Sequence, residues 1–95
     1  MRIAIPLADS VGTLAERFSP TTTFALFDVH DESRSVSYLG RQTTEAPGCG
    51  RTPGFLKGHG VEVVLAHDVS ENAVSHLLEA GIVTIQDAPF FRRTL

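Results

Sequence analysis

The chain has 95 residues, a formal net charge of −3 and 42% hydrophobic residues. A chain of this length forms one domain with a small core, and its apolar content is typical of a folded protein rather than a disordered one. We therefore expect a single domain over residues 1–95, with residues 87–95 as a tail. The negative charge, with Arg92 and Arg93 as the only adjacent basic pair, argues against nucleic acid as a partner.

Nothing in the sequence predicts a membrane protein or a secreted one. No apolar run reaches the roughly 20 residues that a membrane-spanning helix needs. The apolar part of residues 1–6 is too short for a signal peptide, and the alternation of Ile3 and Ile5 predicts a first strand over residues 2–7 instead. The single cysteine cannot form an internal disulfide, which fits a reducing compartment. We expect a cytoplasmic protein without a membrane partner.

The next part of the chain predicts an antiparallel hairpin. After a possible single helical turn over residues 14–18, residues 23–29 are rich in aromatic and branched side chains, and residues 35–39 alternate apolar and polar positions. The polar turn at residues 30–33 joins these two strands. Residues 40–50 then predict a long irregular loop, of a length that is often functional in a compact domain.

The second half alternates helices and strands. Thr52 predicts a helix cap with Pro53 in the first position of a short helix over residues 53–59, which Gly60 ends. Residues 61–66, an apolar run interrupted only by Glu62, predict an inner strand that is buried on both faces.

Ser70 caps the clearest helix of the sequence, with Val69 and Val74 placed as a hydrophobic staple. Gly81 ends this helix, and residues 82–85 form a last strand. The apolar face of the helix consists of Ala73, Val74, Leu77 and Leu78. The element order is β-β-β-α-β-α-β, which predicts an α/β fold with a mixed five-stranded sheet and a right-handed parallel crossover at its end.

Open α/β sheets bind ligands beyond the carboxyl ends of their parallel strands. Those ends are expected at residues 7–10 and 66–68, beside the positive end of the Ser70 helix, which favours anions. The loop that contains Cys49 leads into the preceding helix and could fold over the same edge. We therefore expect Cys49, His67, Asp9 and Asp68 to share one rim.

Cys49 and His67 are the candidate metal ligands. A thiolate between two glycines could bind a soft metal, although an incidental surface thiol is the alternative. His67 follows a buried strand and could contact a metal or an anion, although a structural role is the alternative. The sequence has no C-x-x-C, H-E-x-x-H or P-loop motif. His59, at a helix end, His76, on a polar helix face, and His30, in a turn, are expected to be structural or solvated.

The order and spacing of these segments resemble the dinitrogenase iron-molybdenum cofactor biosynthesis family, over nearly the whole chain from Met1 to about Ile85. The segments that support the resemblance are Met1 to Pro6, Arg17-Phe18-Ser19-Pro20 followed by Phe24 to Asp28, Gly48-Cys49-Gly50, Gly60 to Leu65 and Ala73 to Ile82. The chain departs from the family where Arg17-Phe18-Ser19 replaces a frequent His-Phe-Gly. It departs again where His67-Asp68-Val69-Ser70 replaces a glycine-rich turn.

The resemblance implies a ribonuclease H-like fold and a non-enzymatic role in cofactor assembly related to nitrogen fixation. The cargo would be an iron–sulfur or iron–molybdenum cluster, or its precursor, and the partners would be cluster donor and acceptor proteins. On this reading Cys49 and His67 bind the metal, while Ser70 and Arg17 attract the anionic cluster.

Two other functions stay open. The fold name also suggests a metal-dependent nuclease, which needs several convergent carboxylates, and Asp9 and Asp28 are the candidates. Alternatively, Phe90 and Phe91 on the tail could dock a partner, including a second copy in a homodimer.

Overall fold

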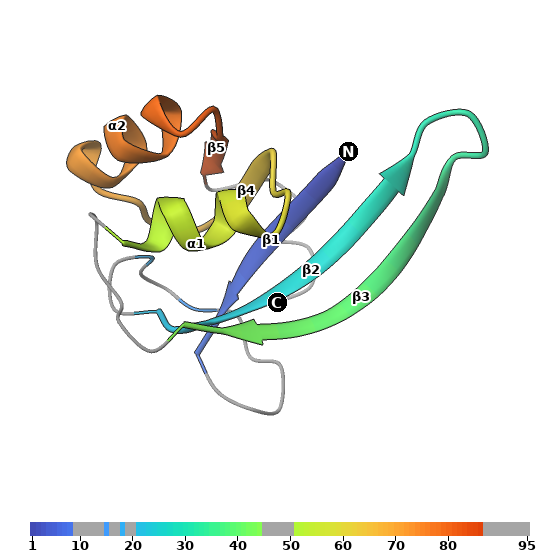
Figure 1. Ribbon diagram of the computed structural model, residues 1–95, viewed down its shortest axis with the longest axis horizontal. Helices are drawn as coiled ribbons and strands as arrows, with labels where there is room; N and C mark the ends of the chain where they lie inside the picture. Colours follow the sequence, from blue (N-terminus) through green and yellow to red (C-terminus); the bar gives the residue numbers. More distant parts are fainter. Residues whose placement is uncertain (9–14, 16–17, 19–20, 45–50, 87–95) are drawn as a thin grey trace.

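The computed structural model describes residues 1–8, 15, 18, 21–44 and 51–86. In chain order they form β1 (Arg2–Leu7), β2 (Thr23–His30), β3 (Ser35–Thr43), α1 (Thr52–Gly58), β4 (Val63–Ala66), α2 (Glu71–Glu79) and β5 (Val83–Gln86) (Figure 1). The strands form one sheet in the order β3-β2-β1-β4-β5. The predicted mixed five-stranded sheet with two helices is confirmed.

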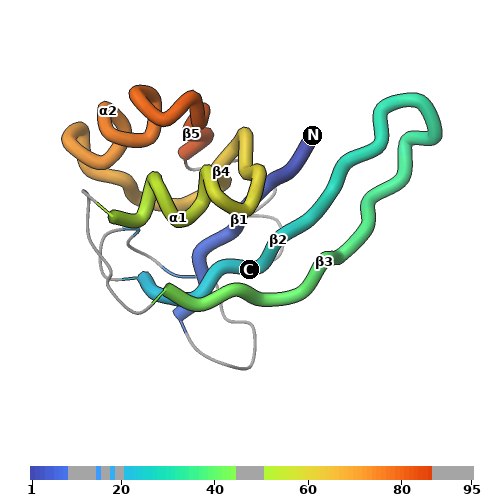
Figure 2. The backbone as a smooth tube through the Cα atoms, in the orientation of Figure 1, coloured from blue at the N-terminus to red at the C-terminus, as the bar shows by residue number. Residues whose placement is uncertain are grey.

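Strand direction defines the two edges of this sheet. β1 pairs antiparallel with β2 and β2 antiparallel with β3, whereas β1 and β4, and β4 and β5, are parallel. Four strands, β1, β3, β4 and β5, therefore end at the same edge, which we call the carboxyl edge. The opposite end of β2 and β3 continues into a hairpin that extends beyond the helices (Figure 2).

Both helices pack on one face of the sheet. Side chains alternate between the two faces of a strand, so residues i and i+2 lie on the same face. The main core cluster contains the sheet residues Ala4, Phe24, Leu26, Val64 and Ala66 together with Leu56 of α1 and Ala73 and Leu77 of α2. We call this the helix face, and the other the uncovered face, because no helix of the described residues packs on it.

β3 is longer than the sequence predicted, so the expectation of a loop from residue 40 onward is wrong for residues 40–43. A register shift between Leu26 and Phe27 of β2 places a bulge at residue 39, after which Arg41 pairs with Ala25. Gly40 has a φ of +104°, which suits a glycine inside such a bulge. The glycine therefore bends the strand rather than ending it.

α1 begins differently from the prediction. Arg51 is its N-cap, without a side-chain cap hydrogen bond, and Thr52 is a helical residue that is 1% exposed. The prediction of Thr52 as the cap is therefore wrong. The end of the helix is as predicted: Gly60 has a φ of +77°, and the Val61 N–H donates to the Leu56 carbonyl at 3.1 Å.

Most of the features predicted for α2 are confirmed. The Ser70 hydroxyl oxygen accepts from the Ala73 N–H at 3.2 Å, and Gly81 has a φ of +81° at the helix end. Leu78, however, is 66% exposed, so its prediction as part of the packed face is wrong. β4 and β5 start two residues and one residue later than expected.

The helical turn expected at residues 14–18 lies largely outside the described residues, as does the tail at 87–95. Neither described helix has the length and hydropathy that crossing a membrane requires.

Candidate functional site

The carboxyl edge gathers polar segments from several elements. β1 ends at Leu7, β3 at Thr43, β4 at Ala66 and β5 at Gln86, all on this side of the sheet. α1 and α2 each return the chain from this edge to the next parallel strand, so both helices begin there. This is the location at which an open α/β sheet is expected to bind its ligand.

Phe18 fixes the loop before β2 against this edge. Its N–H donates to the Asp68 carbonyl at 3.0 Å, in the turn between β4 and α2. Its side chain is 2% exposed and packs on Phe24, with ring centroids 5.7 Å apart. Phe18 and the segment after β4 are therefore adjacent.

His67 and Asp68 follow β4 directly at the carboxyl edge. The His67 side chain is half-buried, whereas Asp68 is exposed. Asp68 also accepts the Phe18 hydrogen bond through its backbone, which fixes the path of the chain between the strand and the helix. A half-buried imidazole in a fixed turn is suited to hold a ligand, since little ordering remains to be done on binding.

The start of α2 has both favourable and unfavourable features for an anion. Its dipole is positive at this end. The hydroxyl oxygen of Ser70 already caps the Ala73 N–H, and the Val69 N–H donates to Gln86 Oε1 at 3.1 Å. Glu71 adds a negative charge in the first turn, which weakens the attraction for an anion. The helix start is therefore at most a secondary contact.

The remaining candidates are not all at this edge. Cys49, Arg17 and Asp9 lie outside the described residues. His59 caps the end of α1 with its ring 4.8 Å from that of Phe55. His76 lies 4.0 Å from Glu79 on the exposed side of α2. Within the described ranges, no group of three or more His, Cys, Asp or Glu side chains could hold a metal ion.

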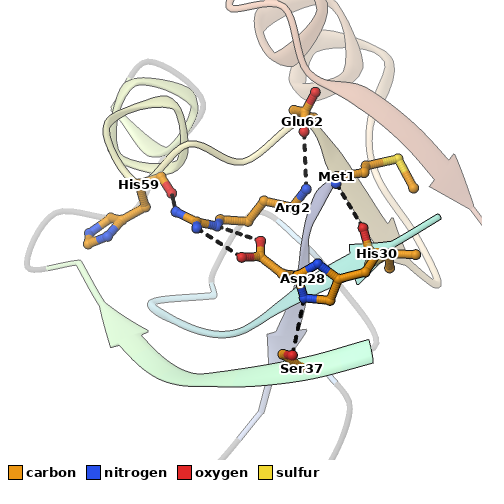
Figure 3. Close-up of polar contacts among 8 residues, drawn as sticks. Met1, Arg2, Asp28, His30, Ser37, His59 and Glu62 are labelled. Carbon is orange, nitrogen blue, oxygen red and sulfur yellow. Dashed lines mark hydrogen bonds and ion pairs between the residues drawn. The ribbon is translucent and has the colours of Figure 1, made fainter. Parts of the chain in front are cut away.

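The strongest polar cluster lies at the opposite end of β1 (Figure 3). Arg2 forms an ion pair with Asp28, through Nε to Oδ1 at 2.9 Å and Nη2 to Oδ2 at 3.1 Å. Its Nη1 donates to the His59 carbonyl at 2.8 Å, and its backbone N–H donates to Glu62 Oε2 at 3.1 Å. The side-chain hydrogen bond with Arg2 lowers the pKa of Asp28, and the same bond raises the pKa of Arg2.

Sequence reasoning missed this cluster. Arg2 and Asp28 are 26 residues apart, and only the register that pairs the first residue of β1 with Asp28 brings them together. The cluster also decides the role of Asp28. A carboxylate that accepts two bonds from a guanidinium, at the end of β1 far from Leu7, is structural. It lies away from the edge where Asp9 was expected.

A hollow at the hairpin turn is lined by His30, Asp31, Glu32 and Ser33. His30 Nε2 lies 3.2 Å from Ser37 Oγ, across the hairpin. None of the predicted ligands lines this hollow, and the carboxyl edge remains the candidate site.

The fold and this edge define the class of protein: a small α/β domain with a mixed sheet, helices on one face, and a polar turn at the end of its inner parallel strand β4. The chain belongs to the dinitrogenase iron-molybdenum cofactor family, whose model matches residues 1–90. This confirms the resemblance found in the sequence, and it makes the protein a small cofactor-related domain.

Several solved structures are similar to the chain over most of its length. The crystal structure of PH0822 is 25% identical, with a TM-score of 0.75, over 90% of this chain and 76% of that one. A NifB-like protein from Thermotoga, TM1290 of the DUF35 family, is 27% identical, with a TM-score of 0.60, over 92% and 76%. The apo form of the orange protein from Desulfovibrio gigas is 25% identical, with a TM-score of 0.64, over 90% and 74%. No curated protein matches the chain.

Proposed function

We propose that this protein binds an iron–sulfur or molybdenum-containing cluster, or a precursor of one, and passes it to an acceptor protein during cofactor assembly. In this role it catalyses no reaction, and its fold is of the ribonuclease H-like kind. The observation that supports the proposal most is the family match over residues 1–90. The orange protein among the similar structures was solved as an apo form, a word that implies a second form with a bound group.

The carboxyl edge is the proposed site. His67 is half-buried in a turn fixed by the Phe18–Asp68 hydrogen bond, and we propose that its imidazole is the first ligand. Cys49 precedes the first residue of α1 by three positions, and we propose that its thiolate is the second ligand. Arg17 precedes Phe18, and a guanidinium there would attract an anionic cluster. Ser70 would contribute through the start of α2.

The nuclease alternative receives less support. Two-metal hydrolysis needs several carboxylates that converge on the metals. Asp28 is occupied by Arg2, whose guanidinium neutralises it at the other end of β1.

The test is anaerobic reconstitution of the full chain with iron and sulfide, and separately with tetrathiomolybdate, followed by metal analysis and absorption spectroscopy. We expect coloured protein, with an affinity at least about 10-fold lower in Cys49→Ser and in His67→Ala, because each change removes a ligand. His76→Ala is the matched control, since His76 is exposed on α2 and interacts with Glu79. Wild-type loading in both the Cys49→Ser and the His67→Ala variants would reject this site, and absence of any bound metal would reject the function.

A further inference from the structure

The uncovered face of the sheet is apolar across all five strands. One cross-strand row contains Tyr38, Phe27, Ile3, Val63 and Val83, in which each residue is the register partner of the next. Alternation places this row on the side opposite Ala4 and Val64, which contact the helices. Both ends of the row are open, because Tyr38 is 57% and Val83 54% exposed.

A second apolar row lies nearer the carboxyl edge. Leu65 pairs with Ile85, and Ile5 pairs with Ala25. Ile5 lies two positions after Ile3 in β1, and Leu65 lies two positions after Val63 in β4. Both therefore lie on the same face as the first row. Ile85 is 45% exposed at the outer strand. Val63 and Ala25, inside these rows, are 9% and 6% exposed, so the exposed apolar surface lies mainly at the outer strands, at Tyr38, Val83 and Ile85. Contiguous apolar surface of this kind is a candidate for contact with another segment or a partner.

The area of this surface indicates whether a second protein or a segment of the same chain would bind it. With strands about 4.8 Å apart and a rise of about 3.3 Å per residue, the two rows cover roughly 20 Å by 13 Å, or about 260 Å² of flat area. A stable dimer buries about 800 Å² of accessible surface on each partner. Even if the accessible area of the two rows were about twice their flat area, it would be smaller than this value. A segment tethered to the same chain needs far less area, because its binding costs no loss of translational freedom.

We propose that residues 87–95 of the same chain cover the uncovered face. This segment follows Gln86, the last residue of β5, and β5 is the edge strand that carries Val83 and Ile85. It contains two adjacent aromatic residues, Phe90 and Phe91. Four residues of extended chain reach about 13 Å, so Phe90 can pass over β4 to β1, and nine residues reach about 30 Å, more than the roughly 20 Å across the five strands. The inference is independent of the proposed cluster binding.

The chain has no tryptophan, so Phe90→Trp introduces a single tryptophan whose emission can be excited selectively beside Tyr38. We expect its emission to be blue-shifted, and its quenching by acrylamide reduced, relative to a free peptide of residues 87–95 with the same substitution. Adding Val83→Thr and Ile85→Thr should return the emission to that of the peptide, because both changes make the face polar while keeping branched strand residues. Leu78→Gln is the control, since this leucine is also exposed but lies on α2, and it should leave the emission unchanged.

Circular dichroism of each variant establishes that it is folded, and sedimentation measures its mass. Emission equal to that of the free peptide in the otherwise unchanged protein would overturn the proposal. A blue shift that is present only at concentrations where a dimer forms would assign the face to a second copy, and would overturn it as well. A blue shift in the monomer that the threonine changes abolish, and Leu78→Gln does not, supports it.

Discussion

Arg2 and Asp28 join the first two strands through two parallel bonds of 2.9 and 3.1 Å. The remaining guanidinium nitrogen of Arg2 donates to the His59 carbonyl, so one side chain connects β1, β2 and the end of α1 (Figure 3). A bidentate arrangement of this kind depends on the planar guanidinium, and lysine could not reproduce it. The pair therefore fixes both the register of β1 against β2 and the position of the turn before β4.

Asp28→Asn should make stability less dependent on pH. Because the hydrogen bond from Arg2 lowers the pKa of Asp28 in the folded state, its stabilising contribution is complete above the unfolded pKa of about 3.9. It is lost as the pH falls through the lower folded pKa. Urea unfolding at pH 7 should thus give a lower free energy for the variant than for the wild type, and the two should converge in acid. An equal difference at every pH would contradict this, and Asp31→Asn on the exposed hairpin turn is the control.

Gly60→Ala should destabilise the protein by about 1–2 kcal/mol, the cost of a left-handed conformation for a residue with a Cβ. Gly60 has a φ of +77°, and a Cβ there would lie 3.2 Å from Nη1 of Arg2. The control is Gly54→Ala in α1, where a Cβ meets nothing within 4 Å, and which should stabilise the helix by about 0.5–1 kcal/mol. Free energies of unfolding in urea measure both. Equal changes in the two variants would show that the turn does not require glycine.

Local signals in the sequence predicted the elements well where a single residue decides the outcome. Ser70, Gly60 and Gly81 mark helix ends through their own hydroxyl group or backbone, and the structure confirms all three. The extent of β3, which depends on a partner strand, was predicted wrongly. β3 continues through Gly40 because Arg41 pairs with Ala25 across the hairpin, and no local pattern contains that pairing.

The candidate site was predictable to the level of a sheet edge. Strand order and direction place His67 and Ser70 at the carboxyl edge, as the element order suggested. The bond between Phe18 and Asp68 was not predictable, because it joins two irregular segments 50 residues apart. The roles of Cys49 and Arg17 remain predictions, since both lie outside the described residues.

Leu56→Ala should cost about 2–5 kcal/mol, because Leu56 is fully buried between α1 and the sheet. Leu78→Ala, the same chemical change at a 66% exposed position of α2, should alter the free energy of unfolding by no more than about 0.5 kcal/mol. Thermal or urea unfolding of the two variants compares them directly. A large loss in Leu78→Ala would mean that this side chain is covered in solution, in contrast to the exposed position described above.

Substitutions at Ser70 separate its role in the fold from its proposed role in cluster binding. Ser70→Ala removes the acceptor for the Ala73 N–H and should cost about 1 kcal/mol. Ser70→Asp keeps an oxygen acceptor, so its free energy of unfolding should stay near that of the wild type, while its charge repels an anionic cluster at the carboxyl edge. Reconstitution with tetrathiomolybdate should therefore give lower loading in Ser70→Asp than in Ser70→Ala, the reverse of their order in stability. If loading follows stability instead, Ser70 acts on the cluster only through the helix that it caps.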